Sequence, residues 1–426
     1  MKKLITALLL LNVFTFGQTN HQLQLQKPII PFQSDIVSFI TDSNDYSIYY
    51  NFRFPYKDLV FERDGNNYTA NFRVIIEVTK DNSKLVVREI KDNQISVDNF
   101  QSTNDKNLFL QDIINFHLNS DKYKVEAKIS DLNSTGDKRL EPVDLNLVEI
   151  QDEMVFNPLI IKSDKFNCEN KSVLLFANSG NQIPFSSESF DLIIPIKDTT
   201  VNELEINIQN NEEQIFKEKI TDSYLMEMGM TKCDDNIVIT SVPNNILVKY
   251  FVLKNINKNL NEGEITISVK SDENEINEEY LLKVFWPDKP FSLIEPEQAI
   301  EFLSFIEPDS VVTSLLDEDE SDYPKILNNY WKKFDPTPET SYNEIMFEYY
   351  NRVDYALKEF KGLGKLNGAK SDRGIIYIKF GKPEKIERTS NPQGLIVETW
   401  TYLNPDKKFS FIDKKGTGNF TLIEDL

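Results

Sequence analysis

The sequence is poor in the residue types that most often carry catalysis or bind metals. Its 426 residues include two histidines, His21 and His117, and two cysteines. From residue 291 onward neither type occurs, which excludes a Ser-His-Asp or Cys-His centre and the usual kind of zinc site there. Elsewhere the acidic fragments lack the ligand spacing of a calcium loop. We therefore predict no metal and no cofactor.

Positive charge is also in short supply. Lys and Arg number 47 against 68 Asp and Glu, which gives a formal net charge of −21. Such a surface repels nucleic acid and anionic lipid, and the sequence has no compensating basic stripe. We expect no nucleic-acid partner. The 40% of apolar residues suffices for real cores, and the length predicts two to four domains.

Long hydrophobic runs are missing after the N-terminus. Lys2 and Lys3 precede a short apolar segment, residues 4–16, and Gly17 lies at the small-residue position before a cleavage site ahead of Gln18. This segment is too short for an ordinary membrane span, and no cysteine follows it to carry a lipid anchor. We predict a signal peptide over residues 1–17, no transmembrane segment after its removal, and export to the periplasm or cell surface.

The two cysteines, Cys168 and Cys233, leave two possibilities open. An exported chain meets an oxidising compartment, where a disulfide between them would stabilise the fold by about 4 kcal/mol. Two free buried thiols are the alternative, since the sequence does not give the distance between them.

Alternation of apolar and polar residues indicates strands over most of the chain. Examples are the runs from Ile48 to Phe54, Tyr68 to Val78 and Ile246 to Val252. Each run is expected to place one face on a core and one in water. Several short strands at this spacing are typical of β-sandwiches, and we predict one over residues 18–155 and another over residues 156–290.

Helical periodicity begins near Leu293. Apolar stripes run from Tyr323 to Phe334 and from Met346 to Phe360, and Ser341 with Glu344 forms a plausible capping box. Four strands are expected after them, the first being IIYIKF from Ile375. The fold class is therefore multidomain, with two all-β sandwiches followed by an α+β domain over residues 291–426.

The segment GKLNGAKS, Gly364 to Ser371, is one substitution from a phosphate-binding loop. Ala369 stands where the loop needs its second glycine. Such a loop must leave a strand and enter a helix, whereas here we expect a helix before it and a strand after it. We therefore interpret it as a turn, with Lys370 solvated and with Ser371 and Asp372 accepting backbone hydrogen bonds.

The last third resembles the GWxTD domain of exported Bacteroidetes-type proteins. The matching segments are YWKKFDPTPETSYNE, YYNRVDYALKEF, GAKSDRGIIYIKFGKPEKIE, ETWTY and FSFIDKKGTGNFTLI. Gly368 and Asp372 match the motif that names the family, while Ala369 replaces its Trp and Ser371 its Thr. The resemblance therefore implies no function that depends on that indole, and it implies no established activity.

A looser similarity links the same region to the small outer-membrane assembly lipoproteins (SmpA/OmlA-like), which pack helices on a short antiparallel sheet and bind partners. By this analogy Gly381 and Pro383 form a tight turn and Trp400 lies on a core strand. Trp331, Gly368 and Gly374 are assigned structural roles as well.

Three functions are compatible with these features. The leading hypothesis is a non-enzymatic envelope interaction or scaffold protein that docks an envelope protein or glycan through its C-terminal domain. Its candidate interface is the DPTPET loop with the charged residues Asp335, Arg352, Asp372 and Arg373, and a buried ion pair that merely braces the fold is the competing interpretation. The alternatives are a glycan-directed hydrolase that uses carboxylates of the last domain, and sugar binding by exposed aromatic rings on a sandwich face.

Overall fold

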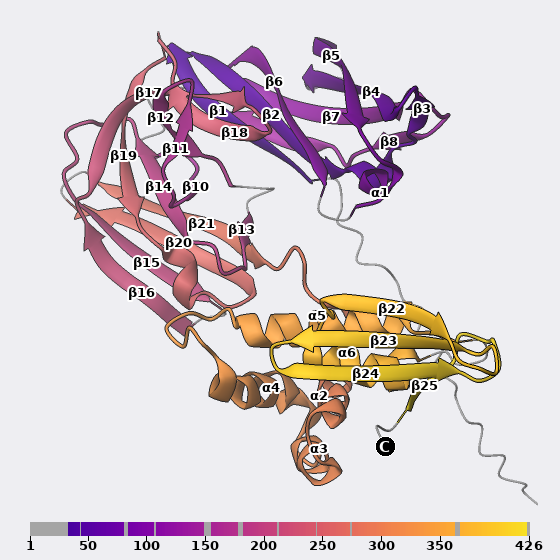
Figure 1. Ribbon diagram of the computed structural model, residues 1–426. Helices are drawn as coiled ribbons and strands as arrows, with labels where there is room; N and C mark the ends of the chain where they lie inside the picture. Colours follow the sequence, from indigo (N-terminus) through magenta and orange to yellow (C-terminus); the bar gives the residue numbers. More distant parts are fainter. Residues whose placement is uncertain are drawn as a thin grey trace, which may run out of the picture.

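The protein is seen in a computed structural model that describes residues 33–42, 44–80, 84–105, 108–148, 155–177, 182–210, 213–243, 245–272, 275–362 and 367–423. The predicted signal peptide lies outside these residues. Figure 1 shows two β-rich parts, followed along the chain by helices and a final sheet. The three parts succeed one another around a bend, so the first and the last face each other across an opening.

The first part contains two sheets that face each other. The three-stranded sheet consists, in order, of β1 (Gln33–Asp42), β2 (Asp45–Pro55) and β6 (Phe109–Asn119). The six-stranded sheet contains β3 (Glu62–Asp64), β4 (Asn67–Lys80), β5 (Lys84–Val97), β7 (Asp121–Asp131), β8 (Asp137–Arg139) and β9 (Val143–Leu147). Residues of β2 and β6 share one core cluster with residues of β4 and β7, as in a sandwich.

Strands β1 and β2 of the three-stranded sheet are covered on both faces, which the alternating pattern did not indicate. Ile48, Tyr50 and Phe52 face the core of the first part. On the opposite face Val37, Phe39 and Tyr49 pack against the second β-rich part. The expectation that the Ile48–Phe54 run leaves its other face in water is therefore wrong, because a second sheet covers that face.

The second β-rich part is also built from two sheets. The seven-stranded sheet runs β10 (Leu159–Lys162), β14 (Phe190–Ile196), β19 (Leu247–Leu253), β17 (Ser223–Cys233), β18 (Asn236–Ser241), β12 (Lys171–Leu175) and β11 (Phe166–Cys168). The five-stranded sheet runs β13 (Gln182–Pro184), β21 (Ile276–Phe285), β20 (Gly263–Ser271), β15 (Leu204–Asn210) and β16 (Glu213–Ile220). Their facing apolar side chains belong to one large core cluster.

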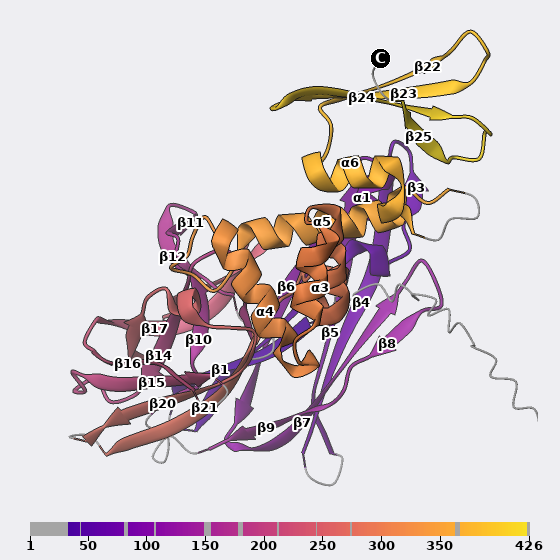
Figure 2. The ribbon, with the colours of Figure 1, turned by 90° about the horizontal axis from the view of Figure 1, so that it is seen from below.

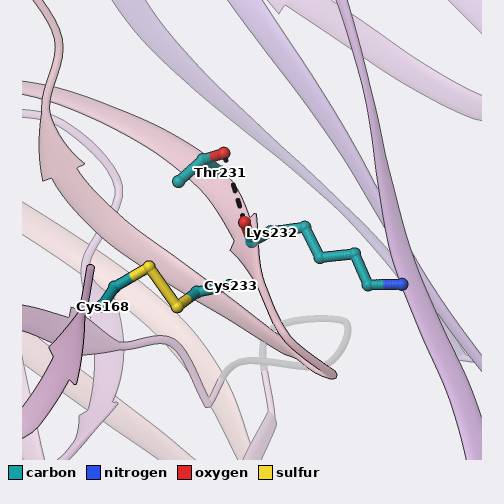
Figure 3. The surroundings of a disulfide bond; sticks show 4 residues. All are labelled: Cys168, Thr231, Lys232 and Cys233. Carbon is teal, nitrogen blue, oxygen red and sulfur yellow. Dashed lines mark hydrogen bonds between the residues drawn. A yellow bond between two sulfur atoms is a disulfide. The ribbon is translucent and has the colours of Figure 1, made fainter.

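A disulfide joins Cys168, at the end of β11, to Cys233, at the end of β17 (Figure 3). The two Cα atoms are 6.0 Å apart, and the half-cystines are separated by 65 positions in the sequence. The bond therefore ties the short β11–β12 hairpin to the main sheet.

Helices follow the second sandwich and share its core. The principal ones are α2 (Pro296–Phe302), α3 (Asp309–Leu316), α4 (Tyr323–Trp331), α5 (Glu344–Glu359) and α6 (Asp372–Phe380), with short 3-10 turns at η4 (Phe291–Leu293), η5 (Leu303–Phe305), η6 (Glu320–Asp322), η7 (Lys332–Phe334) and η8 (Gly368–Lys370). Phe185, Trp286 and Tyr342 form a three-ring contact with centroids 5.0 to 5.6 Å apart. Since these rings belong to one core cluster, apolar packing continues from the sandwich into the helices.

The chain ends in an antiparallel sheet of β22 (Lys385–Ser390), β23 (Ile396–Leu403), β24 (Asp406–Asp413) and β25 (Phe420–Ile423). Figure 2 shows this sheet as a layer of its own, with α6 between it and α5. Trp400, Tyr402 and Phe411 on the sheet pack with Ile376 of α6.

The segment from Ile375 is helix α6, so the prediction of a strand there is wrong. Ser371 caps the helix, since its Oγ accepts a hydrogen bond from Gly374 N at 3.0 Å. The apolar run IIYI fits a helix because α6 is covered on two sides. Ile378 belongs to the core of α5 and the second sandwich, whereas Ile376 and Tyr377 face the terminal sheet.

The predicted fold class is confirmed, because β-rich sheets precede a C-terminal region of helices and a sheet. The boundaries proposed between the three domains stay predictions. None of the helices in the described part of the chain is both long and apolar enough to cross a membrane.

Candidate functional site

The segment Gly368–Asp372 is a structural joint between three elements. Gly368 lies so close to α5 that a Cβ atom there would stand 2.3 Å from Ala356 O, so only glycine fits. Ala369 is fully buried in the large core. Lys370 is exposed. Gly364 to Leu366, the beginning of the phosphate-loop-like segment, lie outside the described residues.

Ser371 and Asp372 accept backbone hydrogen bonds, as predicted. Ser371 Oγ also donates to Gly368 O at 2.6 Å, which closes the turn. Asp372 Oδ2 accepts from Leu422 N at 2.7 Å and thereby holds strand β25 against the start of α6. The helix after this turn corrects the strand expected there, but the segment is still preceded by helix α5 rather than by the strand that a phosphate loop leaves.

The glycines at the two ends of α6 have distinct structural reasons. At Gly374 a Cβ would stand 2.2 Å from Gly368 O, so this residue keeps the joint tight. Gly381 ends the helix with φ +77°, and its carbonyl accepts a hydrogen bond from Tyr402 Oη at 2.9 Å. Pro383 is buried directly after this turn, and Trp331 and Trp400 are both core residues.

A buried carboxylate lies where β23 meets α6. Glu398 is 2% exposed, and its oxygens meet three donors: Arg373 Nη1 at 3.4 Å, Arg388 Nε at 2.6 Å and Trp400 Nε1 at 2.8 Å. Arg373 also donates to Gly418 O at 3.2 Å, and its guanidinium lies over the ring of Phe420 at 4.1 Å. The Arg373 side chain is 11% exposed, so it braces the terminal sheet against α6.

The electrostatics of this cluster favour the ionised carboxylate. Burial alone raises the pKa of Glu398, but the hydrogen bonds from Arg388 and Trp400 and the two nearby positive charges bring it below the ordinary value of 4.5. Burial lowers the pKa of Arg373, and the charge of Glu398 opposes that effect. A group held ionised in this way is not suited to act as a general acid at neutral pH.

The four residues predicted as an interface do not form one cluster. Arg373 and Asp372 lie at the start of α6 and are used within the fold. Asp335 caps its own loop, since its Oδ1 accepts from Thr337 N at 2.9 Å. Arg352 lies on α5, where its Nε pairs with Glu348 at 2.7 Å. In the described part of the chain no hydrogen bond or ion pair joins Asp335 or Arg352 to Arg373, and whether any of the four contacts a partner stays a prediction.

Two other carboxylates of the last domain, Glu344 and Glu339, lie near the start of α5 rather than at Glu398. Glu344 Oε2 accepts from Thr337 Oγ1 at 2.8 Å, near the start of α5, and Glu339 lies in the loop before it. Across the described residues, no three His, Cys, Asp or Glu side chains gather as a metal site.

Arg352 instead lies in a cleft between the first and the last part of the molecule. One wall is helix α1 (Phe100–Thr103) with the two residues after it, and the other consists of α5 with Tyr377 of α6. The volume is about 860 Å³, and the lining residues are Phe100, Gln101, Asn104, Asp105, Glu348, Asn351, Arg352, Asp354, Tyr355, Lys358, Glu359 and Tyr377. We call this the α1–α5 cleft; Figures 1 and 2 show the elements that form it.

Two of the most exposed aromatic side chains of the described residues face this cleft from opposite walls. Phe100 is 64% exposed and Tyr355 is 46% exposed. Tyr377 stacks on Tyr355, with ring centroids 4.4 Å apart and planes 17° apart. Exposed rings that converge on one concavity are typical of binding sites rather than of a solvated surface.

The walls of the cleft are held by apolar packing rather than by the cleft residues themselves. The core cluster containing Val37 and Tyr49 fixes the first part to the second, and the cluster containing Trp286 and Tyr342 fixes the second part to the helices. Position 100 and position 355 are therefore brought together through the intervening sandwich. Sequence reasoning selected Arg352 but missed both rings, because no local pattern shows that α1 faces α5.

Comparisons with known proteins concern mainly the C-terminal part. No curated protein matches the chain. Among solved structures, titin Ig tandem domains A164-A165 cover 60% of this chain and 97% of their own length, at 6% identity and a TM-score of 0.13. A similarity at this level carries no argument. A family model, that of the GWxTD domain, matches residues 267–424, so the C-terminal part of this chain is a GWxTD domain, as its sequence segments indicated.

Proposed function

We propose that the protein is an exported, non-enzymatic interaction or scaffold protein of the cell envelope, and that it docks a partner through its C-terminal domain at the α1–α5 cleft. The signal-peptide pattern of residues 1–17 supports export. The Cys168–Cys233 bond is compatible with an oxidising compartment.

One observation carries the docking proposal. Phe100 and Tyr355 expose their rings into the same cleft although they are 255 positions apart in the sequence. Leaving an aromatic ring in water forgoes the stabilisation that its burial would give, about 25 cal/mol per Å² of apolar surface. A partner that covers both rings would recover that stabilisation.

The hydrolase alternative receives no comparable support. Its best-buried carboxylate, Glu398, is engaged by two arginines and a tryptophan, and its pKa is lowered, whereas a general acid needs a raised one. Sugar binding on a sandwich face needs several exposed rings on one sheet. On the described sandwich strands, the one ring that is about half exposed is Tyr224, at 51%.

The test is affinity capture from an envelope extract with matched variants. Wild-type protein, Tyr355→Ala and Arg352→Glu are compared with Tyr224→Ala, which removes an exposed ring outside the cleft. We expect a partner that is retained by wild type and Tyr224→Ala and lost by the two cleft variants, each of them folded by thermal melting. Equal capture by all four proteins would refute docking at the cleft.

A further inference from the structure

The charged groups of the α1–α5 cleft are largely occupied by one another or by backbone. Arg352 pairs with Glu348 at 2.7 Å, and Lys358 pairs with Glu359 at 3.0 Å. The Asp354 carboxylate accepts from Phe291 N at 2.6 Å and from Ser292 N at 2.9 Å. The four carboxylates of the lining outnumber its two cations, Arg352 and Lys358, so the cleft repels an anionic ligand.

Uncharged polar groups remain available. No hydrogen bond joins the carboxamides of Gln101 and Asn351 or the hydroxyls of Tyr355 and Tyr377 to another group of the described residues. A carboxamide offers both a donor and an acceptor, and a phenol can do the same. These groups suit a ligand that is rich in hydroxyl groups and carries no net charge.

The aromatic rings add flat contact surfaces from two sides. Phe100 projects from the short helix α1, which Asn99 caps by accepting from Ser102 N at 2.9 Å. Tyr355 is backed by Tyr377, so its orientation is fixed by stacking. Rings held in this way stack on apolar faces at a low entropic cost. A pyranose combines such a C–H face with a rim of hydroxyl groups.

We infer that the α1–α5 cleft binds a short segment of an uncharged oligosaccharide, with a sugar ring between Phe100 and Tyr355. This inference rests on the proposed function and names the partner class of the same site. An extended peptide fits this cleft less well, because the lining residues come from helices and a loop and offer no strand edge for main-chain pairing. An anionic glycan is disfavoured by the net charge of −21.

The volume also suits such a ligand. About 860 Å³ lies within the range of roughly 300 to 1,000 Å³ that small-molecule sites occupy, so the cleft holds a few sugar units rather than a whole polymer. Because the cleft is open to solvent at its rim, a longer chain can continue beyond it.

The experiment is calorimetric titration of the full-length protein with hexasaccharides of glucose, mannose, xylose and N-acetylglucosamine, with a hyaluronan hexasaccharide as the charged comparison. We expect at least one neutral hexasaccharide to bind. Phe100→Ala and Tyr355→Ala should each weaken it at least tenfold, whereas Tyr224→Ala, the matched exposed ring outside the cleft, should leave it unchanged. If Tyr355→Ala fails to fold, Phe100→Ala and Gln101→Ala carry the test, because both side chains are exposed.

Absence of binding by every neutral hexasaccharide, tighter binding of hyaluronan, or binding that ignores both cleft rings would overturn the inference. The proposed function fails separately. If no sugar binds but capture of an envelope protein still depends on Tyr355, docking at the cleft stands and only the sugar assignment is wrong. If capture is also independent of Tyr355, both are wrong.

Discussion

Charge reversal at Arg373 is the sharpest test of whether the predicted interface residues act inside or outside the fold. The Arg373 guanidinium is 11% exposed and faces Glu398, which is 2% exposed. Arg373→Glu removes one partner of this pair and places a second carboxylate beside the first. Breaking a buried pair in this way costs about 3–5 kcal/mol. Arg388 remains on Glu398 but cannot also neutralise the new charge.

Arg352→Glu provides the matched control. Arg352 and Glu348 form a partly exposed pair four positions apart on α5, and surface pairs of this kind contribute about 0.3–0.5 kcal/mol. Both variants change the net charge by the same amount, so a difference between them reports burial and geometry rather than total charge.

Hydrogen exchange measured by mass spectrometry can localise the effect. In Arg373→Glu we expect amides of α6 and β25 to exchange about 10²- to 4 × 10³-fold faster than in wild type, since each 1.4 kcal/mol is a factor of ten. Amides of β4 and β7, in the first sandwich, should be unaffected, and Arg352→Glu should resemble wild type throughout. Unchanged exchange in α6 and β25 of Arg373→Glu would show that the ion pair does not brace the sheet, and the reasoning would fail.

Three further predictions concern the same fold. In the folded state the pKa of Glu398 lies below its ordinary value of 4.5, so the ionised carboxylate stabilises the fold above that pH. This stabilisation is lost as the pH falls through the lower folded pKa. Glu398→Gln should therefore flatten the acid limb of a stability-versus-pH curve, and an unchanged limb would contradict this. Replacing Cys168 and Cys233 by serine should lower the free energy of unfolding by about 4 kcal/mol, measured by guanidinium denaturation against reduced wild type, whose stability should match the variant's. Gly368→Ala should cost about 1–3 kcal/mol because its methyl group meets Ala356 O, whereas Lys370→Ala, two positions away and exposed, should change stability by less than about 0.5 kcal/mol in the same assay.

The helices and strands that could be predicted are those that bury one face, because their apolar residues then repeat with a clear period. The stripes from Tyr323 and from Met346 indicated α4 and α5, and both helices bury those stripes. The start of α5 was placed two residues early, because Asn343 rather than Ser341 is its cap: Asn343 Oδ1 accepts from Met346 N at 2.9 Å, while Ser341 N donates to Lys258 O in the second sandwich. A tertiary hydrogen bond thus displaced a plausible local one.

The elements that were misjudged are those covered on two sides. In β2, Tyr49 and Asn51 are buried by the second sandwich, so a sequence that alternates in chemistry does not alternate in burial. Helix α6 was predicted as a strand from Ile375, yet its residues Ile376 and Ile378 belong to two different cores. Periodicity identifies an element with one apolar face, and it becomes ambiguous when layers stack on both faces.

The cleft could not be predicted at all, for a related reason. Phe100 follows a strand of the first sandwich and Tyr355 lies on the outer face of an otherwise ordinary amphipathic helix. Each ring alone resembles a solitary exposed apolar residue, which is common on protein surfaces. The rings reach opposite walls because apolar packing joins the first β-rich part to the second, and the second to the helices.

The motif segment, Gly368–Asp372, and the α1–α5 cleft have different roles, the first in stability and the second in binding. Gly368 and Asp372 connect η8, α6 and β25, and neither lines the cleft. The cleft residues lie on the opposite, solvent-facing side of α5 and α1, where no part of the core depends on Phe100 or Gln101. Substitutions in the motif should therefore act on stability and those in the cleft on binding. Ala369 is fully buried in the joint and does not line the cleft, so the residue at this position acts on packing rather than on docking.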